Sequence, residues 1–203
     1  MKRIFITGST GFIGNNLLSY LALNKKYKIY LINRSGVTKK EKNIYYFKYD
    51  GKITNLINFF KLKKPDLVIH LATNFISNHK EKQISDLIAS NILFGTEILE
   101  SMAKSGCKNI INFGTYWQKY KTYQYNPVNL YAATKEAFEK ILKYYYEIHN
   151  INNVTLMLSD TYGINDQRKK LIDTLIVNSL AEMNINLTDG KQILDLTYID
   201  NII

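Results

Sequence analysis

The sequence predicts an α/β fold built on a Rossmann-like, doubly wound parallel sheet. Short apolar runs alternate with amphipathic helical patterns along most of its 203 residues, which is typical of a parallel sheet covered by helices. The first apolar run, 4–6, leads directly into a glycine-rich turn and a helix. The run 67–72 is apolar apart from His70, which suits a strand buried on both faces. A chain of this length can bury one good core.

The elements follow one another in regular order. Pro65 ends the helix that precedes the fourth strand, because proline cannot continue a helix. After the sixth strand we expect one more helix near 171–183 and a strand within 190–200. The six strands are expected near residues 3–7, 28–33, 44–49, 66–72, 108–113 and 153–158, and the helices between them near 12–24, 54–62, 84–105 and 131–149.

The turn at residues 7–14 has the layout of a dinucleotide pyrophosphate site. Gly8 allows a tight turn, Gly11 lets backbone N–H groups approach phosphates, and Gly14 lets the helix pack against the strand. The N-terminus of the helix then offers unpaired N–H groups and a positive dipole end to an anion. The spacing is G-x-x-G-x-x-G, and an ordinary glycine-rich turn is the alternative reading.

Composition excludes several classes of protein. No apolar run is long enough to span a membrane, and the first strand begins at the N-terminus, so we expect no signal peptide and a cytoplasmic protein. The lone Cys107 excludes an internal disulfide, and three histidines without ligand spacing argue against a metal site. The formal charge of +10 comes mostly from scattered lysines. It favours a solvated surface over a nucleic-acid face and would attract anionic small ligands.

A second candidate site lies after the fifth strand. Tyr131 and Lys135 are four residues apart and share one face of a helix, where the ammonium is expected to lower the pKa of the phenol. Among 16 tyrosines this spacing is a weak signal by itself. Thr115 follows the fifth strand, at the edge of the sheet where ligands bind, although its hydroxyl could equally satisfy local backbone.

In combination, these motifs resemble the extended short-chain dehydrogenase/reductase family, whose members modify nucleotide sugars. The turn resembles that family's T-G-x-x-G-F-I-G, and residues 70–72 resemble its H-x-A strand end. Residues 91–96 are similar to its N-x-x-G-T helix, and 198–200 to its Y-V-D segment. Residues 160–163 match its N-V-Y-G loop, with Asp in place of Asn. Residues 114–131 and 160–170 look most like the 4-keto-sugar reductases of the family.

The resemblance implies a role for each site residue. Tyr131 donates the proton, Lys135 tunes it and holds the nicotinamide ribose, Thr115 hydrogen-bonds the reacting oxygen, and Asn91 supports the lysine. Asp50 would contact adenine; its alternative is an ordinary Asp-Gly turn. The expected cofactor-binding residues are Gly8, Thr10, Gly11, Phe12, Ile13, Gly14, Asn33, Arg34, Ser35, Asp50, Gly51, Leu71, Ala72, Thr73, Tyr131, Lys135 and Tyr162.

NADPH is the expected cofactor, with NAD possible. Asn33 stands where an acidic ribose ligand for NAD would be, and Arg34 can pair with a 2′-phosphate, unless it is simply a loop arginine. Family dehydratases have an Asp-Glu pair after the catalytic Thr, whereas this chain has Tyr116 and Trp117. The expected reaction is therefore reduction of a 4-keto sugar on a nucleoside diphosphate. The alternatives are a 4-epimerase and an inactive NADP-binding protein.

The family resemblance also sets expectations for domains and assembly. Residues 1–164 would form the dinucleotide-binding domain, and 165–203 the start of an incomplete substrate-binding region, since family members usually continue past the Y-V-D segment. A homodimer is expected through the helices near 84–105 and 131–149, where Tyr144, Tyr145 and Tyr146 add apolar area.

Overall fold

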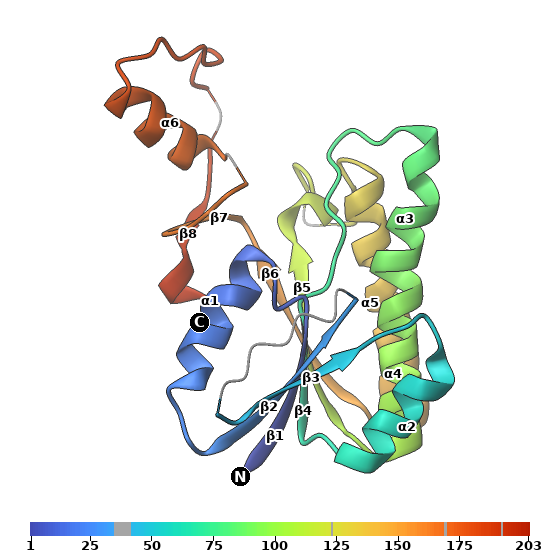
Figure 1. The fold of residues 1–203 in the computed structure, drawn as a ribbon. Coiled ribbons are helices and arrows are strands. Elements are labelled where there is room, and N and C mark those ends of the chain that lie inside the picture. Colours follow the sequence, from blue (N-terminus) through green and yellow to red (C-terminus); the bar gives the residue numbers. More distant parts are fainter. Residues whose placement is uncertain (35–41, 123, 169, 192) are drawn as a thin grey trace. The chain divides into compact units, whose positions relative to one another are not determined.

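The computed structural model describes residues 1–34, 42–122, 124–168, 170–191 and 193–203 (Figure 1). The chain forms two compact units, Met1–Met157 and Leu158–Ile203. Within the described ranges, no helix has the length and apolar character needed to cross a bilayer.

The first unit contains a six-stranded sheet in the order β3-β2-β1-β4-β5-β6 (Figure 1). The strand pairs from β3 through to β5 are parallel. This is the order expected of a doubly wound dinucleotide-binding sheet, with its topological switch point between β1 and β4. The strands are β1 (Lys2–Thr7), β2 (Tyr27–Asn33), β3 (Ile44–Lys48), β4 (Leu67–His70), β5 (Asn109–Thr115) and β6 (Asn152–Leu158).

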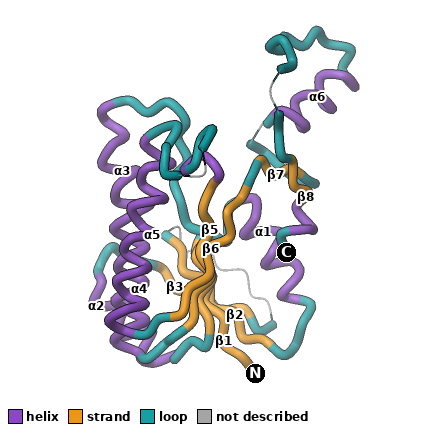
Figure 2. Tube along the Cα trace, turned by 180° about the vertical axis from the view of Figure 1, so that it is seen from behind, coloured by secondary structure: helices purple, strands orange, loops and turns teal. Residues whose placement is uncertain are grey.

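Helices cover both faces of this sheet, as the two opposite views agree (Figures 1 and 2). Helix α1 lies on one face, and α2, α4 and α5 lie on the other. Alternate side chains of each strand therefore enter two different cores. The helices are α1 (Phe12–Ala22), α2 (Ile53–Lys63), α3 (Ile84–Ile88), α4 (Phe94–Ser105) and α5 (Leu130–His149).

The two cores explain the apolar pattern of the strands. Ile4 and Ile6 of β1 pack with Leu21 of α1, whereas Phe5 between them packs with Phe60 of α2 on the opposite face. Phe5 is fully buried and meets the Phe60 ring edge-on, with 4.8 Å between ring centroids. The expectation of a sheet buried on both faces is confirmed.

The predicted elements agree closely with those observed. The expected helix near 84–105 is continuous but consists of α3, a π-helical turn over Ala89–Leu93, and α4. Such a turn admits one extra residue per turn and commonly marks a functional site. Helical periodicity cannot reveal it, because the apolar spacing on either side is unchanged.

The second unit contains a two-stranded parallel sheet of β7 (Asp160–Tyr162) and β8 (Leu196–Tyr198), together with α6 (Leu171–Leu180). The strand expected within 190–200 is shorter than predicted, and α6 ends before the predicted 183. Strand β7 is not predicted at all. Its three residues are too few to show alternation in the sequence.

Candidate active site

The glycine-rich turn after β1 adopts a conformation that requires its glycines. Gly8 has a φ of +71°, and an added Cβ would lie 2.5 Å from the backbone N of Ala72. A Cβ on Gly14 would lie 2.7 Å from Cα of Ser9 and would also strike the carbonyl oxygen of Gly8. The helix and the ends of β1 and β4 therefore approach one another more closely than any other side chain permits.

Gly11 caps the N-terminus of α1 without contributing a side chain. Its own N–H donates to the carbonyl of Gly8 at 3.1 Å, which closes the turn. A Cβ on Gly11 would make only an ordinary contact at 3.4 Å, so packing within the turn does not require glycine there. The missing side chain instead leaves space outside the turn. A helix N-terminus that follows such a turn suits an anion, as a pyrophosphate site requires.

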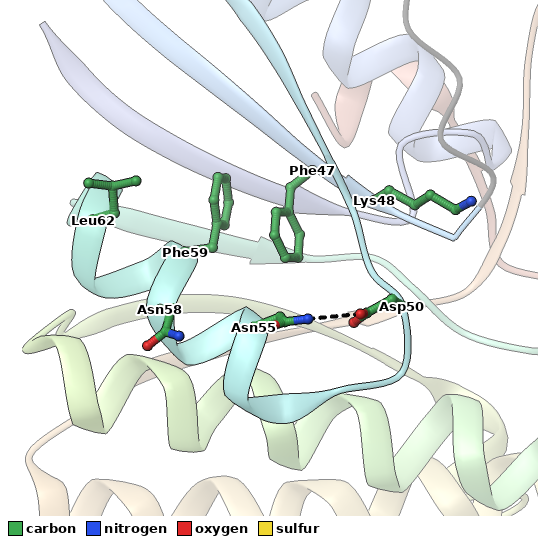
Figure 3. Close-up of a pocket in the computed structure, with 7 residues that line it drawn as sticks. All are labelled: Phe47, Lys48, Asp50, Asn55, Asn58, Phe59 and Leu62. Carbon is green, nitrogen blue, oxygen red and sulfur yellow. Dashed lines mark hydrogen bonds between the residues drawn. The ribbon is translucent and has the colours of Figure 1, made fainter.

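Asp50 and Gly51 follow β3 and form a local turn (Figure 3). The Asp50 carboxylate accepts from Nδ2 of Asn55 at 2.8 Å and from the N–H of Lys52 at 3.1 Å, and these bonds lower its pKa. Gly51 has a φ of +80°. Asp50 lines a pocket of about 350 Å³ together with Phe47 and Phe59. The local Asp-Gly turn is thus present, while the adenine contact stays a prediction.

Tyr131 and Lys135 lie in the first turns of α5, on its inner face. Their exposed fractions are 9% and 4%. The N-terminus of α5 is capped by Asn129, whose side chain accepts from the N–H of Ala132 at 2.9 Å. This cap fixes the start of the helix, and with it the place of Tyr131.

The pKa of Tyr131 is raised to about 12 by burial, and a hydrogen bond with the Thr73 hydroxyl offsets this only in part. The expected lowering by Lys135 is wrong for the chain without ligand. Burial lowers the pKa of Lys135 to about 8, although the charge of Glu139 supports the ammonium. Desolvation therefore dominates the pKa of both side chains, and the phenol is protonated at neutral pH.

Burial and, to a smaller extent, the charge of Lys135 lower the pKa of His70 to about 3. The His70 ring is neutral and shares a hydrogen bond of 2.9 Å between its Nδ1 and Oγ1 of Thr7. The same hydroxyl accepts from the N–H of Ala72 at 3.1 Å. These contacts join the ends of β1 and β4 and place a neutral ring behind Lys135.

Asn91 is 2% exposed and lies in the π-helical turn. The family resemblance implies that Asn91 supports Lys135. Among the described residues, the hydrogen bonds of its side chain go instead to the loop after β4 and to Thr134. It accepts from the Thr73 hydroxyl at 3.0 Å and from the Asn74 N–H at 2.7 Å. Its Nδ2 donates to the Asn74 carbonyl at 3.0 Å and to the Thr134 hydroxyl at 2.9 Å. Asn91 thus positions Thr73, which in turn contacts Tyr131.

The Thr115 hydroxyl accepts from the N–H of Trp117 at 3.3 Å and caps the short turn Tyr116–Gln118. This is the local role that the sequence left open as an alternative. A hydroxyl with one occupied lone pair still has a proton to donate to a ligand oxygen.

Tyr131 is joined to two further aromatic rings through Phe75. The ring of Phe75, which is 52% exposed, lies edge-on to Tyr131 with 5.0 Å between centroids, and its centroid lies 5.5 Å from that of Trp117. Phe75 and Trp117 come from the segments that follow β4 and β5. No periodic signal marks loop residues, so only the fold brings them together.

The remaining predicted residues are dispersed. Thr10 is exposed in the turn, and Phe12 and Ile13 begin α1. Arg34 is exposed after β2, whereas Ser35 lies outside the described residues. Tyr162 belongs to the second unit, where its ring packs against Tyr198 with 5.4 Å between centroids.

Fold and motifs together define the class of protein. The chain belongs to the NAD dependent epimerase/dehydratase family, whose model matches residues 4–203. It is 31% identical over 207 residues to CDP-abequose synthase from Yersinia pseudotuberculosis, covering 99% of this chain and 70% of that protein. The family resemblance expected from the sequence is confirmed.

Solved structures share the fold. UDP-glucose 4-epimerase from Thermotoga maritima, solved with UDP-glucose, has a TM-score of 0.85 at 20% identity, covering 98% of this chain and 70% of that one. UDP-glucuronic acid 4-epimerase from Bacillus cereus, in complex with UDP-glucuronic acid and NAD, has a TM-score of 0.84 at 22% identity with the same two coverages, 98% and 70%. The predicted Rossmann-like α/β fold is confirmed.

Proposed function

We propose that this chain is an NAD(P)-dependent oxidoreductase that reduces the C4 carbonyl of a 4-keto-6-deoxyhexose carried on a nucleoside diphosphate, a reaction of the kind that supplies sugars for surface polysaccharides. The observation that carries the proposal is the buried pair Tyr131 and Lys135, on a helix beside the loops that follow β4 and β5. The 31% identity to CDP-abequose synthase over nearly the whole chain supports the same reaction class.

The residues present fit a nicotinamide dinucleotide. The tight turn that Gly8 and Gly14 permit and the N-terminus of α1 suit its pyrophosphate, and Asp50 suits its adenine. When bound, the nicotinamide supplies a hydride to C4 of the hexose. Arg34 is exposed after β2 and can pair with a 2′-phosphate, which favours NADPH over NADH. The solved relative with NAD supports a dinucleotide but not this preference.

Tyr131 supplies the proton in this proposal. With a pKa of about 12 the phenol is protonated at neutral pH, which is the form that a reductase needs to donate to a carbonyl oxygen. Lys135 stands one turn along α5 and holds the nicotinamide ribose. The Thr115 hydroxyl donates its proton to the substrate oxygen. Asn91 keeps Thr73 in place beside Tyr131.

A 4-epimerase is the second candidate, favoured by the fold of the two solved epimerases. An epimerase oxidises and then reduces the same carbon, so it needs the phenolate in its first step and keeps its cofactor bound throughout. The raised pKa of Tyr131 argues for the reductase. An inactive NADP-binding protein is the candidate from another class, and it would bind cofactor without turning over any nucleotide sugar.

We further propose that residues 165–203, which lie within the second unit, begin the region that binds the sugar nucleotide. We also propose a homodimer through α3, α4 and α5. Large apolar side chains are exposed on these helices: Ile84, Ile88 and Leu93 on the first stretch, and Tyr144, Tyr146 and Ile148 on α5. An apolar face of this kind is a marker of protein–protein contact.

Titration of the purified chain with NADPH and with NADH, followed by nicotinamide fluorescence, tests the proposal first. Tight binding of NADPH with weak binding of NADH is the expected result. A preference for NADH, or NAD that stays bound through purification, would move the proposal to the epimerase. Binding of neither nucleotide would contradict the cofactor site altogether.

A further inference from the structure

Gln118 is fully buried in the loop that follows β5, and its side-chain amide makes three hydrogen bonds. Its Oε1 accepts from the backbone N–H of Thr115 at 2.9 Å. Its Nε2 donates to Oε2 of Glu136 at 2.9 Å and to Oε1 of Glu139 at 2.8 Å. One neutral group therefore joins the loop of Thr115 to two carboxylates on α5.

The two carboxylates need such a group between them. Glu136 and Glu139 are three residues apart on one helix, where like charges repel. The side-chain amide of glutamine has two N–H donors on one nitrogen, so it can donate a hydrogen bond to each carboxylate without adding charge. Outside this pair, Lys140 forms an ion pair with Glu136 at 2.9 Å, and Lys119 also lowers the pKa of Glu136.

The surrounding sequence makes room for this arrangement. A Cβ on Gly114 would lie 3.0 Å from Oε1 of Gln118, 3.0 Å from Oε1 of Glu139 and 2.5 Å from Sδ of Met157. A Cβ there would force these three side-chain ends to shift, and the φ of Gly114 is not in the left-handed region. The lack of a Cβ at Gly114 therefore gives room to the Gln118 contacts rather than allowing a turn.

Both ends of the Gln118 contacts reach groups of the proposed reaction. The Thr115 backbone is held by Oε1 of Gln118, and the Thr115 hydroxyl by Trp117, so the turn is fixed from two sides. Glu139 lies four residues beyond Lys135 and supports its ammonium, while His70 from β4 faces the same ammonium as a neutral ring. The position of Glu139 thus bears on the charge of Lys135.

We propose that Gln118 is a positioning residue, which fixes the Thr115 hydroxyl relative to the Lys135 ammonium by tying the loop after β5 to Glu136 and Glu139 on α5. This inference rests on the proposed function, because it concerns the groups assigned to proton and cofactor handling there. A displacement of about 1 Å in such a group can reduce a rate about 100-fold.

Turnover of Gln118→Met and Gln118→Glu with NADPH and a nucleoside-diphosphate 4-keto sugar tests the role. Gln118→Met keeps the volume and loses the donors, so kcat should fall about 100-fold, with the Kd for NADPH changed by less than about threefold. In Gln118→Glu a protonated carboxyl can still donate to one neighbour. Its activity should therefore fall as pH rises, on a limb that the wild type lacks.

Gln83→Met is the matched control, since the side chain of Gln83 accepts from the N–H of the nearby Lys80 and touches no group of the proposed reaction among the hydrogen bonds of the described residues. It should leave kcat and Kd unchanged. A kcat for Gln118→Met within about threefold of wild type would overturn the proposal. So would a parallel loss of kcat, NADPH affinity and unfolding midpoint, because that pattern indicates a purely structural residue.

A second measurement does not depend on turnover. NMR titration of the Lys135 side chain in the lysine-labelled chain, assigned with Lys135→Met, should show a lower pKa in Gln118→Met than in wild type, because Glu139 is released from its place near the ammonium. An unchanged Lys135 pKa would overturn the positioning role. If wild type shows no turnover, the proposed reaction fails, while this titration still decides the role of Gln118.

Discussion

The buried ammonium of Lys135 should lower the free energy of unfolding of the chain. The pKa of this group falls from the ordinary 10.5 to about 8. Such a fall corresponds to about 3 kcal/mol of unfavourable free energy for the charged form in the folded state. Between pH 8 and 10.5 the unfolded chain binds more protons than the folded chain, so stability rises with pH there. Below about pH 8 the full cost remains.

Lys135→Met removes the charge and keeps most of the apolar stem. We expect it to stabilise the ligand-free chain at pH 7 by up to about 3 kcal/mol, which raises the melting temperature by about 6–12 °C for a domain of this size. The gain should shrink above about pH 8 and vanish above pH 10.5, where the wild-type lysine becomes neutral in both states. Urea unfolding of both proteins at a series of pH values measures this directly.

Lys143→Met is the control on the same helix, because Lys143 is exposed and should change the stability by no more than about 0.5 kcal/mol. A Lys135→Met variant that is less stable than wild type at pH 7 would refute the reasoning. A stabilisation that does not vary between pH 7 and pH 10.5 would refute it too, since it would then arise from packing rather than from charge.

Three further outcomes are expected. Gly8→Ala places a Cβ 2.5 Å from the Ala72 backbone at a φ of +71° and should weaken NADPH binding at least about 100-fold in a fluorescence titration. Thr73→Val removes the hydroxyl that lowers the pKa of Tyr131, so that pKa should rise further in a spectrophotometric titration. Leu93→Glu charges the exposed face proposed for dimerisation and should shift sedimentation toward the monomer; an unchanged sedimentation coefficient would count against that face.

The fold could be predicted from the sequence because its signals are local. Each buried strand is a short apolar run, and each helix repeats its apolar side chains at helical spacing. The glycine turn was also predictable, since Gly8 and Gly14 occupy positions where a Cβ does not fit. The order of the strands then follows from the family of folds that such an alternation permits.

The candidate site was harder to predict, because its details depend on contacts between distant segments. The partners of Asn91 are Thr73, Asn74 and Thr134, which lie 17 to 43 residues away. Burial rather than spacing decides the pKa of Tyr131, so a helical i, i+4 pattern gave the wrong direction. Gln118 has no periodic signal, and its role emerges only from the two carboxylates that it meets.

The most direct test is a comparison of wild type and Tyr131→Phe, with NADPH and a CDP-linked 4-keto-6-deoxyhexose. We expect wild type to oxidise NADPH in step with formation of the 4-hydroxy sugar. Tyr131→Phe should bind NADPH normally and lose at least about 100-fold in kcat, because the proton donor is gone. A variant that retains a tenth or more of the wild-type kcat would contradict the assignment. So would a wild type that leaves the 4-keto sugar unreduced but inverts C4 of a nucleoside-diphosphate hexose without net consumption of NADPH.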